Sequence, residues 1–270
     1  MTLVIPIVVI SLRRSSARRM AMIANLRDLG ISFSFFDAVD GQTMTEEEIA
    51  AISPEPYRGY KGRLLTSGEI ACAESYRRAL QQFLASDSDY VCIAEDDCEF
   101  TPDALGYLVP AALKRLEPFD ILRLVTDPAR EGGLTRIILK DGLHVIHAPL
   151  RLGFFTLAQV FSRTGARKVL DGLVPLWAPI DMILYRDTGI VGLRVLELRP
   201  AVVSHREVDT TIQERFSPRT GVYASFRVEV RRRLWLFRRR LRAVRSYRKA
   251  WGWAGLWKLR ATSWLGLLRL

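Results

Sequence analysis

The sequence has few cysteines and histidines and no long apolar run. Its three cysteines form an odd set with no C-x-x-C spacing, which argues against a disulfide framework or a zinc knuckle. No stretch reaches the ~18 uninterrupted apolar residues that would span a bilayer. The apolar residues 1–10 are followed, not preceded, by Arg13 and Arg14, which is the wrong order for a signal peptide. We therefore expect a cytoplasmic protein whose cysteines are reduced and buried.

Acidic residues are almost absent from the C-terminal end of the chain. From Arg227 onward there are 14 Lys and Arg residues and one acid, a charge of +13. The preceding 226 residues carry 26 basic and 28 acidic side chains, so the formal net charge of +11 belongs to the tail. The charge of the body gives no reason to expect a nucleic acid partner. We predict a catalytic body over residues 1–226 and a basic helical tail over residues 227–270.

The tail has the composition of a helix that lies on a membrane. Its apolar residues recur at spacings of three and four, and arginines fill the other positions. Five of the six tryptophans of the chain follow residue 226. Because arginine binds lipid phosphates and tryptophan favours the headgroup boundary, we expect a peripheral protein on an anionic surface, the inner face of the cytoplasmic membrane. A basic helix packed on the body and an RNA-binding arm are the alternatives.

The body begins with a β-α-β pattern. Residues 3–12 are typical of a buried strand, a helix begins at Ser15 or Ser16 and ends at Gly30, and residues 31–37 form a second strand. A parallel pair with a right-handed crossover follows from this order. Capping boxes at Thr45 and Thr66 predict two more helices. The later segments predict an α/β fold that becomes more mixed along the chain, with a helix at 164–170 and strands at 89–94, 120–125, 136–139, 143–146, 154–161, 193–196 and 201–203.

The most informative segment is VCIAEDDCEF, residues 91–100, in which an apolar strand ends in a row of acids. Strand alternation predicts Glu95 and Asp97 on one face and Asp96 on the other. Sheets with parallel strands bind ligands beyond the carboxyl ends of these strands, and adjacent carboxylates repel each other unless a cation compensates. Such oxygens suit Mg²⁺ or Mn²⁺ that bridges to substrate phosphates. A polar strand end that meets solvent is the alternative.

Six segments of the chain together form a recognisable pattern. In order they are VISLRRSSARR (9–19), FSFFDAVDG (33–41), LTSGEIACAES (65–75), IAEDD (93–97), FSRTGARKVL (161–170) and APID (178–181). They resemble glycosyltransferase family 25, the bacterial lipooligosaccharide sugar transferases and their relatives, over roughly residues 5–215. IAEDD is similar to the family's form of the metal-binding D-x-D motif. Tyr76 departs from the pattern, because the family usually has His there, and His205 stands where the family usually has Gln.

The resemblance implies a GT-A-like, Rossmann-like fold with a mixed, mostly parallel sheet flanked by helices. It also implies a metal-dependent inverting glycosyltransferase that moves a sugar, galactose above all, from a UDP-sugar to a lipid-linked saccharide. On this interpretation Asp97 is the direct ligand of Mn²⁺ or Mg²⁺. Glu95 contacts the ribose or a metal-bound water, and Asp96 is a neighbouring donor-site group.

Inverting transfer also needs a base for the acceptor hydroxyl. Asp181, after Pro179, is the first candidate, although a helix N-cap would explain it equally. Glu131 and Asp127, in a glycine-containing loop, are further candidates. His205 is either a late metal ligand or a polar residue at a strand end.

Several residues are candidates for donor binding. Arg13, Arg18 and Arg19 could contact the diphosphate or the uracil side of the donor, since arginines and helix N-termini both favour phosphate. A solvated helix face is the alternative for each of them. Gly68 and Glu69 belong to the donor site by resemblance, although the capping box explains Glu69 without function.

Two rival functions remain open. A nucleotidyl- or phosphotransferase would use the same acidic strand end and consume a nucleoside triphosphate. A non-catalytic, transferase-like protein would bind glycans or membranes, an interpretation that Tyr76 favours. Hydrolysis of nucleotide sugars in the presence of Mn²⁺ separates these from the leading hypothesis.

Overall fold

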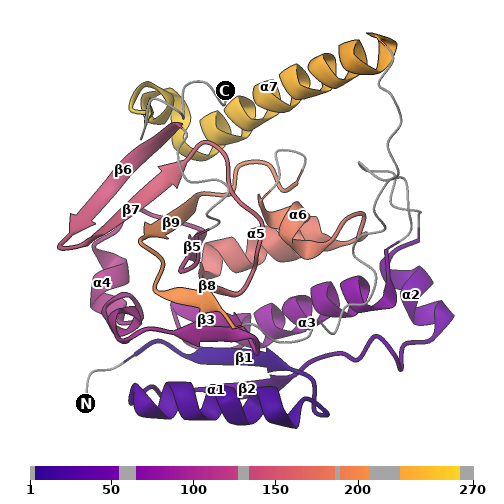
Figure 1. Ribbon diagram of the computed structural model, residues 1–270, viewed down its shortest axis with the longest axis vertical. Coiled ribbons are helices and arrows are strands. Elements are labelled where there is room, and N and C mark those ends of the chain that lie inside the picture. The colour runs from indigo at the N-terminus through magenta and orange to yellow at the C-terminus, as the bar shows by residue number, and fades with distance from the viewer. Residues whose placement is uncertain (1–3, 55–64, 127–133, 186–188, 207–225, 262–270) are drawn as a thin grey trace.

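The structure is a computed structural model that describes residues 4–54, 65–126, 134–185, 189–206 and 226–261. A nine-stranded sheet runs through it in the order β11-β6-β7-β9-β5-β8-β3-β1-β2 (Figure 1). Beside it, β4 (Cys98–Phe100) pairs with β10 (Val203–His205). The strands of the large sheet are β1 (Ile7–Ser11), β2 (Ser34–Asp37), β3 (Tyr90–Glu95), β5 (Ile121–Arg123), β6 (Leu134–Asp141), β7 (His144–Pro149), β8 (Ala158–Ser162), β9 (Val195–Arg199) and β11 (Arg260–Ala261).

The mixed α/β sheet is confirmed, but parallel pairs are the minority among the described strands. The pairs β1–β2, β1–β3 and β5–β9 are parallel, and the other five are antiparallel. One reason is the β6–β7 hairpin, which turns at Gly142 and Leu143, where Gly142 has a φ of 57°. The other is β8, which lies antiparallel between β3 and β5. The expectation of a mostly parallel sheet held only for the opening β-α-β unit and the β5–β9 pair.

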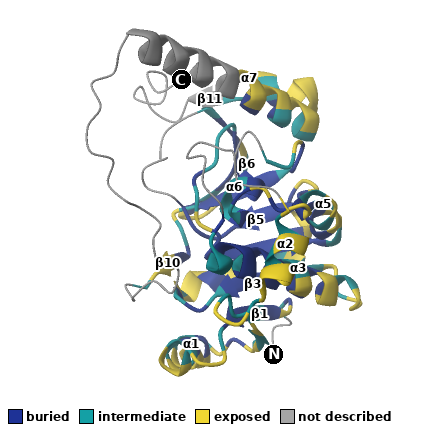
Figure 2. Ribbon diagram, turned by 90° about the vertical axis from the view of Figure 1, so that its right-hand side faces the viewer, coloured by how far each residue is buried: buried dark blue, intermediate teal, exposed yellow. Residues whose placement is uncertain are grey.

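Helices cover both faces of the sheet. Residues of α1 (Ser16–Asp28), the short 3-10 helix η1 (Pro102–Tyr107) and α4 (Pro110–Lys114) share a core with the side chains of Val9 and Cys92. Residues of α3 (Ser67–Leu84), α5 (Arg163–Leu173) and α6 (Ile180–Tyr185) share the other core with Ile10 and Ile93. Figure 2 shows the resulting dark blue layer inside exposed helix surfaces. Burial on both faces explains the near-continuous apolar strands.

The predicted helix boundaries are largely confirmed at the N-terminal half. Capping boxes are present at Thr45, which begins α2 (Glu46–Ile52), and at Thr66, which begins α3. Gly30, with a φ of 66°, follows the end of α1 as expected. Cys92 and Cys98 are buried free thiols, and burial raises the pKa of Cys92 to about 12. These cysteines are therefore inert core residues.

The C-terminal helix α7 (Phe226–Trp257) lies across one end of the molecule, at the top of Figure 1, and bends at Gly252. The Tyr247 hydroxyl donates to the carbonyl of Ala148 at 3.2 Å, and the Arg136 guanidinium lies 4.8 Å from the centre of the Trp251 ring. Strand β11 then pairs with β6. These contacts join this part of the tail to the body, while the domain boundary at residues 226 and 227 stays a prediction.

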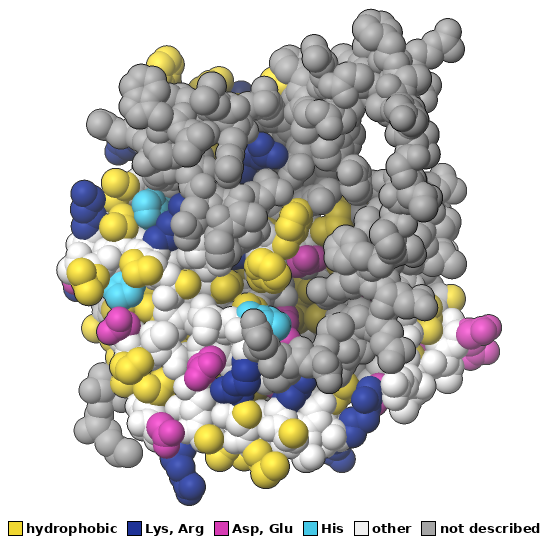
Figure 3. All heavy atoms as spheres, viewed as in Figure 1, with side chains coloured by type: hydrophobic (Ala, Val, Ile, Leu, Met, Phe, Trp, Pro, Cys, Tyr) yellow, Lys and Arg dark blue, Asp and Glu magenta, His cyan; other side chains and the backbone are white. Residues whose placement is uncertain are grey.

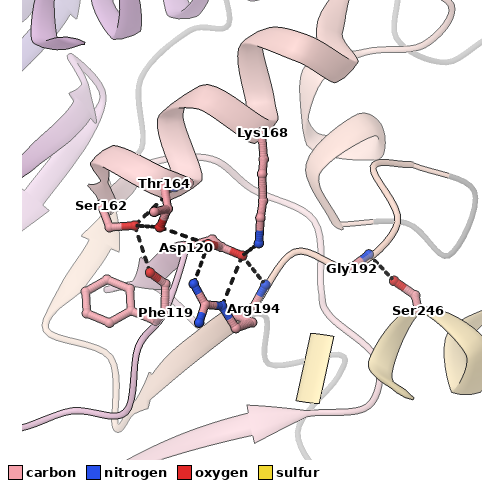
Figure 4. A network of polar contacts seen from close by, with 9 residues as sticks. Phe119, Asp120, Ser162, Thr164, Lys168, Gly192, Arg194 and Ser246 are labelled. Carbon is pink, nitrogen blue, oxygen red and sulfur yellow. Dashed lines mark hydrogen bonds and ion pairs between the residues drawn. The ribbon is translucent and has the colours of Figure 1, made fainter. Parts of the chain in front are cut away.

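The start of α5 is anchored by a buried carboxylate (Figure 4). Asp120 has no exposed side-chain area and accepts hydrogen bonds from Lys168 Nζ at 2.6 Å and from the backbone N–H of Arg194 at 2.8 Å. Arg194 Nη2 adds an ion pair at 3.1 Å. Ser162 caps the helix by accepting from the N–H of Gly165 at 3.1 Å. The FSRTGARKVL segment therefore has a structural role.

We predict that Gly165→Ala destabilises the fold by about 3 kcal/mol, at the upper end of the usual cost of overpacking. An added Cβ would lie 2.0 Å from the carbonyl oxygen of Asp120, a backbone atom that cannot rotate away. Urea unfolding measures the change. Gly106→Ala is the control, because no atom lies within 4 Å of its added Cβ. Equal midpoints for the two variants would contradict this account of the α5 contact.

Candidate functional site

The acidic cluster is divided between the two faces of the sheet. Strand β3 ends at Glu95, and Asp96 and Asp97 form the turn into β4. Glu95 contacts Tyr76 of α3, whereas Asp96 contacts Arg18 of α1. The alternation expected for Asp97 does not apply, because the strand has ended before it. Asp97 lies near Arg18, on the side of Asp96.

Glu95 is held by two hydroxyl groups. Tyr76 Oη donates to Glu95 Oε1 at 3.1 Å and also lies 3.3 Å from the carbonyl oxygen of Thr156. The Thr156 hydroxyl donates to the same carboxylate oxygen of Glu95. Burial raises the pKa of Tyr76 well above its usual value, and the charge of Glu95 raises it further. The residue that departs from the family pattern is thus a neutral donor that orients Glu95.

The candidate donor arginines gather at the carboxyl ends of β1 and β2. Arg18 Nη1 lies 3.1 Å from Asp96, which also accepts from the Ser11 hydroxyl at 2.7 Å. Arg19 bonds the Ser11 carbonyl at 2.8 Å and Asp37 at 2.6 Å. Arg13, largely exposed, lies 2.8 Å from the same Asp37. Arg19 and then Arg13 lower the pKa of the Asp37 carboxyl. The structure brings these arginines together at a sheet edge suited to an anionic ligand.

Asp97 offers the most suitable oxygen for a cation. Its Oδ2 atom lies 3.6 Å from His205 Nε2 and 3.9 Å from Arg18 Nη1. Its Oδ1 atom is buried without a hydrogen-bond partner among the described residues. Burial raises the pKa of the Asp97 carboxyl, which His205 and Arg18 partly offset. A buried carboxylate oxygen left unpaired is costly, and a divalent ion would satisfy it.

The three predicted metal ligands do not converge in the structure. Over the described ranges no three His, Cys, Asp or Glu side chains lie close enough to hold one ion. Asp97 and His205 form a pair, whereas Glu95 is held by Tyr76 and Thr156. Two protein ligands with the remaining positions filled by phosphate oxygens and water are common for Mg²⁺. Asp97 and His205 fit such a site, and metal binding by this pair stays a prediction, whereas the structure does not bring Glu95 to them.

The predicted base lies on the Glu95 side of the sheet. Asp181 is in the first turn of α6, and its Oδ1 accepts from the N–H of Met182 at 2.8 Å. Tyr185 ends the same helix, with its ring 4.5 Å from the Arg123 guanidinium. Burial raises the pKa of the Tyr185 hydroxyl far above its usual value, and Glu95 and Asp181 both contribute. Glu95 and Asp181 are therefore both on the side of the sheet that faces Tyr185.

Sequence reasoning missed a buried polar row across the sheet. Arg123 of β5 has no exposed area, and its Nη1 lies 2.7 Å from Glu197 Oε2 of β9. Gln159 of β8 stands opposite Arg123, and both polar atoms of its amide are buried without partners within the described part of the chain. Buried charged and unpaired polar groups are costly and concentrate at functional sites. The sequence did carry a sign of this polar row, because Arg123 interrupts the apolar run ILRLV and Gln159 interrupts the apolar run LAQVF.

The remaining candidates have structural explanations or lie outside the described residues. Glu69 is buried and accepts from the N–H of Thr66 at 3.0 Å, as the capping box requires. A Cβ added to Gly41 would lie 2.8 Å from the backbone N of Gly68, so the turn after β2 packs against the start of α3. Glu131 and Asp127 lie outside the described residues, and their roles stay predictions.

The comparisons with known proteins agree with this arrangement. Residues 4–128 match the family model for glycosyltransferase family 25 (LPS biosynthesis protein). This chain belongs to glycosyltransferase family 25. The matched residues include the strands and turns that carry the candidate donor arginines and the acidic cluster.

Two curated relatives and one solved structure complete the comparison. The chain is 30% identical to the probable inactive glycosyltransferase 25 family member 3 of Bos taurus, over 60% of this chain and 28% of the relative. It is 30% identical to procollagen galactosyltransferase 2 of Homo sapiens, over 66% of this chain and 29% of the relative. It thus spans less than a third of either. The inositol-1-phosphate CTP transferase from T. maritima aligns over 78% of this chain and 92% of its own, with 12% identity and a TM-score of 0.34, too low to support an argument.

We predict that Tyr76→Phe lowers the free energy of unfolding by about 1–2 kcal/mol, because the hydroxyl bonded to Glu95 and the Thr156 carbonyl is lost while the ring is kept. Chemical denaturation measures the change. Tyr90→Phe is the control, since the Tyr90 hydroxyl makes no hydrogen bond within the described structure and its ring stacks on Phe119. A loss no larger than that of the control would mean that Tyr76 does not hold Glu95.

Proposed function

We propose that this protein is a metal-dependent inverting glycosyltransferase that transfers galactose from UDP-galactose to a lipid-linked saccharide in the synthesis of cell-surface lipooligosaccharide. The observation that carries the proposal is the buried, unpaired carboxylate oxygen of Asp97 at the end of β3, within the family-25 segment. It lies at the carboxyl edge of the parallel strands, beside Arg18 and His205. Donor binding at this edge follows the general rule for such sheets.

Asp97 and His205 would hold Mn²⁺ or Mg²⁺, which supplies charge neutralisation for the nucleoside diphosphate leaving group. The residues of this chain add to that effect. Arg18 places a guanidinium 3.1 Å from Asp96 and 3.9 Å from Asp97, so a positive charge is fixed at the same edge before any substrate binds. Arg19 and Arg13 extend the positive charge toward Asp37.

Asp181 is the proposed base that removes the proton of the acceptor hydroxyl. It lies on the Glu95 side of the sheet, across from the arginines of α1, so donor diphosphate and acceptor hydroxyl would approach from different sides. Its carboxylate is only partly buried and is already oriented by the N–H of Met182. A carboxylate held in one orientation is suited to accept a proton as the new bond forms.

A second candidate function is non-catalytic glycan binding. It is favoured by two observations: no three-ligand metal group is found among the described residues, and several matched relatives are named as inactive or probably inactive. Incubating the protein with a panel of nucleotide sugars and Mn²⁺ separates the two, because only the transferase hydrolyses a donor slowly without acceptor. Consumption of a nucleoside triphosphate instead would indicate a nucleotidyl- or phosphotransferase.

For the metal, we predict that Asp97→Asn abolishes the Mn²⁺ dependence of UDP-galactose binding, because the ligand loses its charge and keeps its shape. Calorimetric titration with and without Mn²⁺ provides the measurement. Asp89→Asn, the same change just before the start of β3, is the control and should bind like the parent. If Asp97→Asn still bound UDP-galactose in an Mn²⁺-dependent way, Asp97 would not be a metal ligand.

For the base, we predict that Asp181→Asn keeps donor affinity and lowers kcat by about 10²–10⁴-fold, the usual range for loss of a general base. Steady-state kinetics with the acceptor identified from a glycoside panel measure this, and Asp171→Asn on the exposed side of α5 is the control. If donor affinity falls and kcat does not, Asp181 is a donor-site or structural residue, and Glu131 becomes the next candidate base.

The described part of the tail supports a peripheral membrane contact. Trp253 and Trp257 are 63% and 85% exposed, and Leu241 and Val244 are also exposed. Arg248 lies 4.9 Å from the centre of the Trp253 ring, so cationic and aromatic groups share one surface. No helix in the described ranges is long and apolar enough to cross a membrane. An anionic bilayer is the proposed partner of this surface.

We predict that replacing Trp253 and Trp257 together by Ser weakens binding to anionic vesicles by roughly tenfold or more, about 1.4 kcal/mol. These side chains point away from the core, so the fold is retained. Co-sedimentation with phosphatidylglycerol vesicles at low and high salt measures the effect. Salt should weaken the contribution of the arginines to vesicle binding, which is about 1 kcal/mol per residue. The contribution of the apolar side chains should not change with salt. Trp177→Ser, on the body, is the control. Unchanged co-sedimentation of the double variant with vesicles would show that this surface is not the membrane contact.

A further inference from the structure

Phe155 combines two properties that are rarely found together. Its φ angle is 77°, which makes it the single non-glycine residue with positive φ in the described ranges. A bulky side chain in this conformation is an outlier that costs of order 1–3 kcal/mol. Its ring is 47% exposed, so burial does not compensate for this cost. One exposed aromatic residue needs no explanation, but an exposed aromatic residue on a strained backbone does.

The surrounding contacts hold this backbone in place. Arg123 Nη2 donates to the carbonyl of Phe154 at 2.6 Å and to that of Phe155 at 3.2 Å. The next residue, Thr156, donates its hydroxyl to Glu95 and accepts at its carbonyl from Tyr76. A buried cation, a carboxylate and a buried phenol thus fix the 154–156 loop, which consists of Phe154, Phe155 and Thr156. A strained backbone that several surrounding contacts hold in place is typical of segments that clamp a ligand.

The loop stands on the side of the site opposite the donor arginines. Its anchors Glu95 and Arg123 project from the sheet toward α3 and α6, and the guanidinium of Arg123 lies over the ring of Tyr185 in the helix that carries Asp181. The arginines of α1 contact Asp96 and Asp37 on the other side. Figure 3 shows that acidic, basic, histidine and hydrophobic side chains all occur on the face of the molecule seen in Figure 1. The identified polar groups nearest the loop are Glu95 and Arg123, which bond Thr156 and the carbonyls of Phe154 and Phe155.

We infer that Phe155 is the stacking platform for the acceptor sugar. A pyranose ring has hydroxyl groups at its edge and C–H groups on its face, so an exposed aromatic ring binds the face while nearby polar groups bind the edge. Phenylalanine has no polar group of its own, which leaves orientation of the sugar to the neighbouring carboxylates. The strained backbone keeps the ring of Phe155 exposed, one residue from Thr156, whose hydroxyl is bonded to Glu95. This inference rests on the proposed function and names the acceptor side of the same site.

The strain makes a sharp test possible, because glycine at position 155 removes the ring and the strain together. Phe155→Gly is expected to unfold at a higher temperature than the parent, since glycine adopts a positive φ without cost. Its KM for the acceptor should rise roughly tenfold, while the rate of UDP-galactose hydrolysis without acceptor is unchanged. Phe155→Tyr keeps an aromatic face and should restore the acceptor KM to within about twofold. If Phe155 served stability alone, Phe155→Gly would unfold at a lower temperature than the parent and would keep the parent's KM for the acceptor.

Saturation-transfer NMR with methyl β-galactoside and methyl β-glucoside adds a readout that does not depend on turnover. The parent and Phe155→Tyr are expected to bind one of these glycosides, and Phe155→Gly to bind it roughly tenfold more weakly. Equal glycoside binding and equal acceptor KM in parent and Phe155→Gly would overturn the inference. So would an unfolded Phe155→Gly protein, or a fall in donor hydrolysis that matches the fall in transfer.

Measurements on the parent separate this inference from the proposed function. A parent protein that neither hydrolyses any nucleotide sugar nor binds either glycoside would overturn the proposed function and the inference with it. A parent that does both, with glycoside binding unaffected by Phe155→Gly, would overturn the inference alone.

Discussion

The buried guanidinium of Arg123 is the constraint on which the site depends. Removing a guanidinium from water costs several kcal/mol unless its donors are paired. Its partners come from three separate parts of the chain: Glu197 of β9, the carbonyls of the 154–156 loop, and the Tyr185 ring of α6. The pairing of Nη1 and Nη2 of this one buried guanidinium therefore fixes a strand and a loop relative to one another, and its contact with the Tyr185 ring adds a helix. Such preorganisation is what a site that must hold two substrates requires.

The acidic cluster follows from a second constraint, the end of β3. A strand directs alternate side chains to opposite faces only while it remains a strand. Because β3 ends at Glu95, the side chain of Glu95 points toward α3. The next two residues, Asp96 and Asp97, lie in a turn and point toward α1. The three acids then experience different surroundings: hydroxyl donors at Glu95, a guanidinium at Asp96, and partial desolvation at Asp97. This separation allows one carboxylate to orient a loop while its neighbour remains available to a cation.

The local pattern of the sequence predicted the elements better than their assembly. Capping boxes and the glycine that ends a helix act through neighbouring residues, so Thr45, Thr66 and Gly30 could be recognised directly. The antiparallel insertion of β8 between β3 and β5 depends on long-range pairing, for which no short-range signal exists. The site, too, depends on long-range contacts for which the sequence carries no local signal. The resemblance pointed to the acidic strand, but the role of Arg123 depends on partners about thirty and more than seventy residues away.

The tail connects to the site through a shared crevice. Leu184 and Tyr185 of α6 line it on one side, and Tyr247 and Trp251 of α7 line it on the other. Residues 150–152, which precede the 154–156 loop, close it. Because Tyr247 and Trp251 pack on the body while Trp253 and Trp257 face outward, the bend at Gly252 gives one helix a core-facing part and an exposed part. The core-facing part of α7 thus lines the crevice together with the end of α6, and the exposed tryptophans begin two residues beyond Trp251, so the crevice and the exposed surface are joined by one short bend of the chain.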